Sequence, residues 1–307
     1  MDIYLPIAEV SVNWPTLVIL GAVVGFVSGL FGIGGGFLMA PILVFLGIPP
    51  TVAVASQASH VVASSTSGVI RYAGQGAVDF KMGAVMATGG AAGALAGVEL
   101  FRYLRLVGQA DLVVALSYLV FLGAIGVLML NESLTEILRR RRGVPAPRKE
   151  RRRPMWLYGL PLRIKFPKSG LYISALPPFG LGVFAGVLSA IMGVGGGFIL
   201  VPAMLYVLRM RAGVVVGTSL FQIIITTAIT TILQAGRNQT VDIVLSTILL
   251  LGGVVGAQIG ARFAGRFRAE ELRAALGLIV LLVGIQMGLE LFVRPADIFM
   301  IAPGVPE

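Results

Sequence analysis

The sequence predicts an all-α polytopic membrane protein made of two inverted-topology repeats, each with a glycine-rich broken or re-entrant helix pair and three spanning helices. Charged residues form only 12% of the 307-residue chain and mean hydropathy is +0.93, whereas a soluble domain carries about 25% charged residues. Apolar segments follow one another along the whole chain, and the first half of the sequence recurs in the second. These observations indicate that lipid surrounds most of the protein.

The apolar segments have lengths suited to a bilayer. They lie at 17–32, 37–47, 51–70, 83–101, 110–130, 177–192, 198–208, 213–234, 243–263 and 272–293. Most approach the roughly 20 residues that cross a bilayer as a helix. The segments at 37–47 and 198–208 are too short to cross unaided, and they hold corresponding places in the two halves. We therefore expect each to form a broken or re-entrant pair with the segment before it.

The internal repeat is visible residue by residue. Gly25–Pro41 aligns without a gap on Gly186–Pro202, which lies 161 positions later. The same register continues to Asp79 and Asp242 with a drift of only two positions. Self-similarity of this extent indicates a duplicated structural unit. It predicts a first transmembrane repeat at 1–138, a basic cytoplasmic linker at 139–170 and a second transmembrane repeat at 171–307.

The basic residues are concentrated where the two repeats join. Twelve of the 24 basic residues lie between Arg139 and Lys168, opposed only by Glu150. The net charge of +10 is therefore a local property, and we expect no nucleic-acid partner. Each Arg or Lys at the bilayer centre costs about 2.5 to 3.5 kcal/mol on insertion scales, so this cluster should stay in the cytoplasm. Anionic lipid headgroups are a further expected contact of the linker.

Three consecutive glycines precede each short apolar segment. They are Gly34, Gly35 and Gly36 in the first half and Gly195, Gly196 and Gly197 in the second. Free backbone N–H groups and a helix N-terminus then coincide, which favours an anion without a buried cation. Close helix packing is the alternative reading. Packing is what we expect for the glycines spaced four apart, namely Gly89, Gly93, Gly97, Gly252, Gly256 and Gly260.

Polar side chains recur at helical spacing in the segment after each short helix and form a polar stripe, which in the first half includes Ser56, His60 and Ser64. The candidate substrate-binding residues there are Ser56, Gln57, His60, Thr218, Ser219 and Gln222. Hydroxyl and amide groups can donate to oxyanion oxygens without adding charge, although Ser and Thr can also bond back to their own helix. His60 can shuttle a proton or serve only as a packing donor. Arg71 can attract an anion or gate the site, or it can extend to the headgroups.

The chemistry-bearing residues are few. The chain has no cysteine and one histidine, and the apolar segments hold almost no carboxylates. Metal sites and acid–base catalysis need clusters of such groups. We therefore expect no metal, no cofactor and no enzyme activity.

The doubled elements Gly32-Ile-Gly-Gly-Gly-Phe37 and Gly193-Val-Gly-Gly-Gly-Phe198, each with a proline four residues on, resemble the TauE/SafE sulfite exporter family, also called the toluene sulfonate uptake permease family. Gly76-Ala-Val-Asp79 fits as well, and the likeness spans both halves. The resemblance implies transport of sulfite or organosulfonates across the bacterial inner membrane. From the distribution of basic residues we expect residues 139–168 to be cytoplasmic and both termini to be periplasmic.

The residues and the resemblance together predict a carrier. It exports sulfite or a small organosulfonate by alternating access around a midplane site formed by the two glycine tips. Its partners are a small anionic substrate and the lipid bilayer, and assembly as a homo-oligomer stays open. An anion channel and an importer of another sulfur oxyanion are the alternatives, and an intramembrane enzyme is the least supported.

Overall fold

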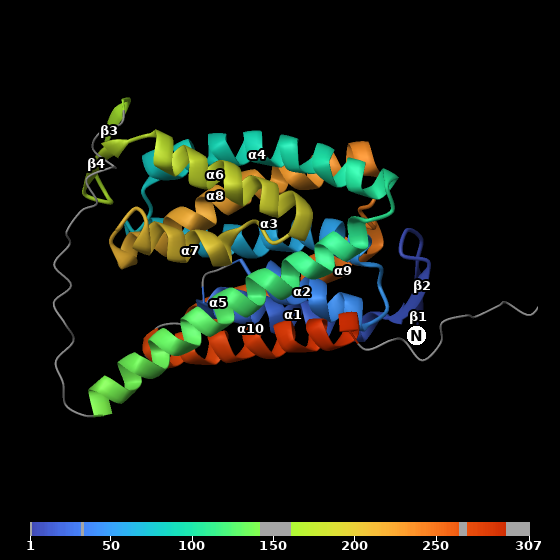
Figure 1. Cartoon of the computed structure of the whole chain (residues 1–307). Helices are drawn as coiled ribbons and strands as arrows, with labels where there is room; N and C mark the ends of the chain where they lie inside the picture. Colours follow the sequence, from blue (N-terminus) through green and yellow to red (C-terminus); the bar gives the residue numbers. More distant parts are fainter. Residues whose placement is uncertain (1, 32–33, 142–160, 264–268, 293–307) are drawn as a thin grey trace, which may run out of the picture.

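The computed structural model describes residues 2–31, 34–141, 161–263 and 269–292 (Figure 1). Its two halves contain the same elements in the same order: a β-hairpin, a long helix, a short helix and three further helices. In the first half these are β1 (Asp2–Leu5), β2 (Val10–Asn13), α1 (Trp14–Phe31), α2 (Gly36–Phe45), α3 (Pro50–Gly74), α4 (Phe80–Leu106) and α5 (Ala110–Arg141). In the second half they are β3 (Arg163–Phe166), β4 (Leu171–Ser174), α6 (Leu176–Met192), α7 (Gly197–Tyr206), α8 (Ala212–Leu233), α9 (Ile243–Phe263) and α10 (Ala269–Phe292), with a π-helical turn η2 (Gln234–Asn238) after α8.

Each apolar segment of the sequence forms one of these helices. The short helices α2 and α7 are ten residues long, as the interrupted hydrophobic pattern predicted. Most of the predicted linker, 142–160, and the C-terminal residues 293–307 lie outside the described residues. The proposed domain boundaries at 138 and 170 stay a prediction, although α5 continues to Arg141 and β3 lies within the predicted linker.

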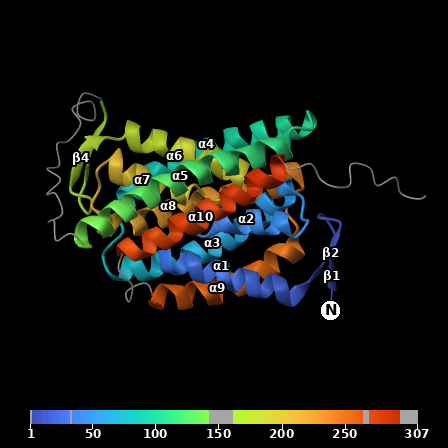
Figure 2. The same ribbon diagram turned by 60° about the horizontal axis from the view of Figure 1, so that its bottom comes forward.

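The two β-hairpins were not predicted from the sequence. In both, antiparallel strands of four residues pair along their whole length. Glu9 and Gly170 lie 161 positions apart in the two turns, and both have a positive φ, 54° and 66°. The hairpins therefore extend the internal repeat beyond the stretch that alignment detected. They lie at opposite ends of the helical body (Figures 1 and 2).

The two halves are interleaved rather than placed side by side. Helix α1 packs along α9, and its counterpart α6 packs along α4 (Figure 2). Helix α3 packs against its counterpart α8, and α5 against α10. Every one of these major interfaces joins the first half to the second, so neither half forms its core alone.

Glycines spaced four apart line the interfaces between α1 and α9 and between α4 and α6. A Cβ on Gly256 would overlap the carbonyl oxygen of Ala22, and one on Gly93 would overlap that of Val183. A Cβ would likewise overlap atoms of the facing helix along both seams, at Gly21, Gly25, Gly29, Gly89, Gly97, Gly182, Gly186, Gly252 and Gly260. Close backbone approach of this kind is how membrane helices gain van der Waals contact. The packing role predicted for the four-spaced glycines is confirmed.

Two buried aspartates cap helices and tie the halves together at the ends of the body. Asp79 Oδ1 accepts from Met82 N at 3.2 Å, while its Oδ2 accepts from Ser169 N at 2.9 Å and Ser169 Oγ at 2.7 Å. Asp242 Oδ1 accepts from Leu245 N at 3.1 Å, and its Oδ2 accepts from Ile7 N at 2.9 Å. Each aspartate thus caps a helix of its own half and holds the hairpin of the other half. We call these arrangements the Asp79 clasp and the Asp242 clasp.

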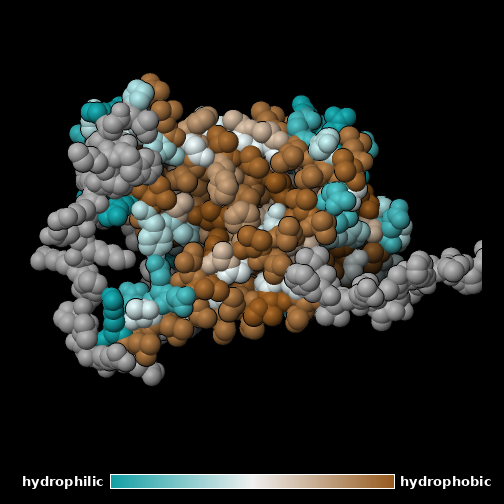
Figure 3. All heavy atoms as spheres, viewed as in Figure 1, coloured by the Kyte–Doolittle hydropathy of each residue, from teal (hydrophilic) through white to brown (hydrophobic). Residues whose placement is uncertain are grey.

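The outer surface of the body suits a membrane. Figure 3 shows an apolar band between two ends that carry hydrophilic side chains. Many large apolar residues of the helices are exposed, among them Ile19, Val120, Leu128, Ile232, Leu251, Val255 and Leu282. Among the described residues, five helices are long and apolar enough to cross a bilayer: Trp14–Phe31, Phe80–Leu106, Ala110–Glu136, Gly213–Asn238 and Ile243–Phe263. The protein is therefore a multi-pass, mostly helical membrane protein, as predicted.

Candidate functional site

The glycine tips are sharp turns that begin the two short helices. Gly34 and Gly35 have φ values of 87° and 66°, and Gly195 and Gly196 have values of 70° and 74°. Glycine adopts this left-handed region without the steric penalty that a side chain brings. Helix α2 then begins at Gly36, and α7 begins at its counterpart Gly197.

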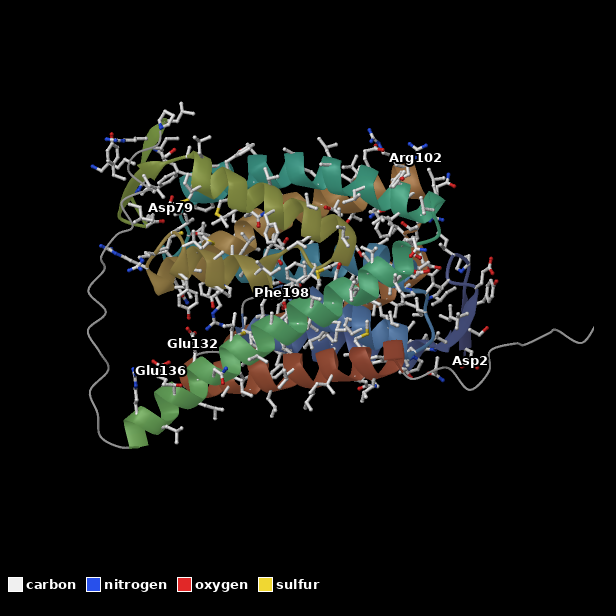
Figure 4. All side chains as sticks on the ribbon, viewed as in Figure 1. Asp2, Asp79, Arg102, Glu132, Glu136 and Phe198 are labelled. Carbon is white, nitrogen blue, oxygen red and sulfur yellow. The ribbon has the colours of Figure 1, made fainter. Side chains whose placement is uncertain are left out.

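The two tips meet inside the protein. A Cβ on Gly36 would lie 3.1 Å from Val194 Cα and 3.4 Å from the carbonyl oxygen of Gly193, which are backbone atoms of the other tip. Phe37 and Phe198, the next residues, are buried and their ring centroids lie 6.1 Å apart. Figure 4 places Phe198 well inside the body, between Asp79 near one end and Arg102 near the other. The structure thus brings together the two glycine tips that the sequence singled out.

The electrostatics of this region come from the backbone. The first N–H groups of a helix have no acceptor within the helix, and the helix dipole makes its N-terminus positive. Here the N-termini of two ten-residue helices converge. Residues 34–45 and 193–206 contain no Asp, Glu, Lys or Arg. An anion at the tips would therefore meet the positive ends of two helices, and neither short helix carries a cationic side chain.

Several side chains of helices α3 and α8 face the tips, and one of them, Ser64, donates through Oγ to the carbonyl oxygen of Gly34 at 3.3 Å. An ideal Cβ on Gly34 would lie 3.5 Å from Val61 and 3.7 Å from Ile223, and one on Gly195 would lie 3.4 Å from Val61. The hydroxyls of Ser65 and Thr227 lie beside Gly34 and Gly195 respectively. These two residues were not among the candidates predicted from the sequence. The repeat register, which pairs Ser65 with Thr227, was the signal that could have found them.

Gln57 is the predicted polar residue that the structure brings to a tip. Its Nε2 donates to the carbonyl oxygen of Met192 at 2.9 Å and lies 3.0 Å from the hydroxyl oxygen of Tyr118. The Tyr118 hydroxyl donates to the same carbonyl. Met192 is the last residue of α6, so Gln57 and Tyr118 satisfy a carbonyl that the helix end leaves open.

Ser56 and Thr218 have partners in the clasps instead. Ser56 Oγ accepts from Asp242 N at 2.8 Å, and Thr218 Oγ1 accepts from Asp79 N at 2.9 Å. Ser219 Oγ donates to the carbonyl oxygen of Val216 in its own helix at 2.9 Å. These three hydroxyls therefore have structural partners, and their binding of substrate stays a prediction.

His60 and Gln222 occupy corresponding positions on the glycine seams. The His60 ring lies directly over Gly253, and the Gln222 side chain lies over Gly90. Gln222 Nε2 lies 2.7 Å from Thr226 Oγ1, whereas both ring nitrogens of buried His60 lack a hydrogen-bond partner among the described residues. Both side chains thus fill space that the glycines leave.

Arg71 lies in the last turn of α3, half-buried. It is six residues beyond Ser65, which corresponds to about 9 Å along a helix. Its predicted part in attracting an anion stays a prediction.

Comparison with known proteins identifies the family. A sequence model described as Sulfite exporter TauE/SafE matches residues 17–287, which include both tips and both clasp aspartates. The chain belongs to the TauE/SafE family. Relatives of this family member include a "Probable membrane transporter protein" of Xylella fastidiosa, 29% identical over 86% of this chain and 91% of its own length. The "Probable membrane transporter protein YjnA" of Bacillus subtilis is 27% identical over 89% of this chain and 98% of its own length.

A shorter likeness carries a more specific name. The "Sulfite exporter TauE/SafE family protein 3" of Arabidopsis thaliana is 42% identical over 52 residues, which are 17% of this chain and 11% of that protein. No solved structure matches this family member. The relatives that match most of the TauE/SafE chain are named as membrane transporters, so membrane transport is its class of function.

Proposed function

We propose that this TauE/SafE protein carries sulfite or a small organosulfonate across the bacterial inner membrane, with the two glycine tips forming one central site. The observation that supports this most directly is the meeting of two helix N-termini inside the membrane-spanning body without a charged side chain on either short helix. Such termini bind anions through backbone N–H groups. Broken helices that point their N-termini at an anionic substrate are a recurring feature of carriers.

The orientation that we propose follows the basic residues. Lys168 and Arg211 lie beside the loop after α3 and the β3–β4 turn, as their closeness to Gly76 and Gly170 indicates. Basic residues favour the cytoplasmic side. The end with β3 and β4 is then cytoplasmic, and the end with β1 and β2 is periplasmic. Because the two hairpins lie at opposite ends, the repeats are inverted in this proposal.

Export is the direction that the membrane potential favours for an anion. Moving one negative charge outward through an inside-negative potential yields about 2.3 kcal/mol per 100 mV. Movement of one repeat against the other would expose the tips to each side in turn. The Asp79 and Asp242 clasps link the halves at the two ends of the body, so their hydrogen bonds would have to shift during such a movement.

Reconstitution tests this proposal. Purified protein in proteoliposomes is assayed with radiolabelled sulfite, thiosulfate, taurine and sulfoacetate. We expect saturable flux of at least one of them and counterflow, in which unlabelled anion inside drives uptake of labelled anion. Flux that is linear in concentration and shows no counterflow would indicate the anion channel instead. The absence of flux for every sulfur oxyanion would refute the proposed substrate class.

A variant pair tests the tips. Gly35 has a positive φ, and a Cβ there would lie 2.5 Å from Ser28 Cβ, so Gly35→Val should abolish flux. Gly108 also has a positive φ, 74°, but has no atom within 4 Å of its Cβ position. Gly108→Val is therefore the matched control for backbone strain and should retain flux. If the two variants lost flux equally, backbone strain alone would account for the loss, and the tip would no longer be assigned to the substrate site.

A further inference from the structure

Ser65 and Thr227 are unusual among the hydroxyl residues of α3 and α8. Both are fully buried, and neither Ser65 Oγ nor Thr227 Oγ1 has a hydrogen-bond partner among the described residues. Hydroxyls in membrane helices commonly bond back to a carbonyl of their own helix. Neighbours do so here, since Ser67 Oγ donates to Ala63 O at 3.3 Å and Thr231 Oγ1 to Thr227 O at 2.8 Å. The two unpaired hydroxyls therefore need another explanation.

Their position supplies that explanation. An ideal Cβ on Gly34 would lie 3.2 Å from Ser65 Oγ, and one on Gly195 would lie 2.6 Å from Thr227 Oγ1. Each unpaired hydroxyl thus lies against one glycine tip. The two are counterparts in the internal repeat, and Val61 lies near both tips. One site with a hydroxyl from each half fits this arrangement.

The surroundings define the charge that such a site accepts. Helices α1, α2, α6, α7 and α8 contain no Asp, Glu, Lys or Arg. The titratable side chains of α3 are His60, which faces Gly253, and Arg71 and Tyr72 near its end. The site therefore offers N–H and O–H donors beside the apolar side chains of Val61 and Ile223. In a medium of low dielectric constant, the cost of removing an ion from water rises with the square of its charge, so such a site favours a monoanion over a dianion.

We propose that Ser65 and Thr227 are the substrate-contacting hydroxyls of the transport site, and that this site takes a sulfur oxyanion as its monoanion, either hydrogen sulfite or a sulfonate. The inference rests on the proposed function and specifies the ionic form of its substrate. The hydroxyls donate to the substrate oxygens, and the apolar side chains of Val61 and Ile223 supply no counter-charge. Sulfate and the sulfite dianion are excluded by their second charge.

Proteoliposome flux at several pH values tests the ionic form. Sulfite changes from hydrogen sulfite to the dianion as pH rises through neutrality, whereas methanesulfonate stays a monoanion. Sulfite flux at a fixed total concentration well below KM should fall in proportion to the hydrogen sulfite fraction, and methanesulfonate flux should stay constant. Sulfate should not compete with either. Sulfite flux that rises with the dianion fraction, or competition by sulfate, would overturn the proposal.

Variants at the two hydroxyls test the assignment of residues. Loss of a hydrogen bond to a charged group weakens binding by about tenfold or more, so Ser65→Ala and Thr227→Val should each raise KM by that factor. The ligand-free variants should melt no lower than the wild type, because an unpaired buried hydroxyl contributes no hydrogen bond. Thr227→Ser keeps the hydroxyl and should retain the wild-type KM. The controls Ser67→Ala and Thr231→Val remove hydroxyls bonded within their own helices and should leave KM unchanged.

The outcomes separate the inference from the proposed function. A wild-type KM in both Ser65→Ala and Thr227→Val, with transport intact, would refute the inference alone. A lower melting temperature without a change in KM would assign the hydroxyls to packing and would also refute it. The absence of all sulfur-oxyanion flux in the wild type would instead refute the proposed function.

Discussion

Removing the hydroxyls of Ser56 and Thr218 should destabilise the protein and leave substrate binding unchanged. Each hydroxyl accepts from a buried backbone N–H, that of Asp242 at 2.8 Å and that of Asp79 at 2.9 Å. In Ser56→Ala and Thr218→Val these N–H groups lose their partner. An unsatisfied buried donor costs about 1 to 3 kcal/mol, so each variant should lose that much free energy of unfolding.

The two losses should also add. The Asp79 clasp holds β3–β4 and the Asp242 clasp holds β1–β2, and these hairpins lie at opposite ends of the body. Variants at distant sites without shared partners are additive within about 0.5 kcal/mol. The double variant should therefore lose about 2 to 6 kcal/mol, measured by SDS titration in mixed micelles. KM for the transported anion should match the wild type.

The contrary result is equally specific. Unchanged stability together with a raised KM would place Ser56 and Thr218 in the substrate site, as the polar stripe in the sequence first suggested. A strong departure from additivity would show that the two ends of the protein are coupled. Thr218→Ser, which keeps the acceptor oxygen, serves as the control and should retain wild-type stability.

Two further predictions concern the glycine seams. Gly256→Ala places a methyl group onto the carbonyl of Ala22, and this overpacking should cost about 1 to 3 kcal/mol of stability. The control Gly180→Ala has open space at its Cβ and should change stability by no more than about 1 kcal/mol. Equal melting temperatures of the two variants would contradict the close packing inferred for the glycine seam. His60→Gln introduces the side chain of its repeat counterpart and should retain both folding and flux, while His60→Ala leaves a void over Gly253 and should lower the melting temperature. Loss of flux in His60→Gln, with folding intact, would instead indicate that the ring itself takes part in transport.

The sequence was sufficient for the helices and for the tips, because long apolar segments and a repeated glycine pattern are strong signals. It was not sufficient for the hairpins. Their strands are only four residues long, and local pattern cannot distinguish such strands from loops. Part of their anchoring comes from Asp79 and Asp242, which lie far away in sequence.

The polar stripe shows a different limit of sequence reasoning. Helical spacing correctly grouped Ser56, His60 and Ser64 on one face, but it could not tell which neighbour that face meets. In the structure Ser56 meets a clasp and His60 meets a glycine seam. Ser65, one position beyond the stripe, is the residue that lies at the tip with no partner. A side chain's partners depend on how the two halves pack together, and periodicity within one helix carries no information about that packing.

The interleaving of the halves has a consequence for how the protein is made. Helix α1 packs along α9, yet Phe31 leaves the ribosome roughly 210 residues before Ile243, which is about 10 to 40 seconds at ordinary rates of synthesis. During that interval the glycine seam of α1 has no native partner in the bilayer, and the same holds for α4 until α6 is inserted. Biogenesis is therefore a period in which unpaired small-residue faces are exposed to lipid, to insertion factors and to membrane proteases. Helix α9, which emerges late in synthesis, completes the interface of α1, the first helix to be made.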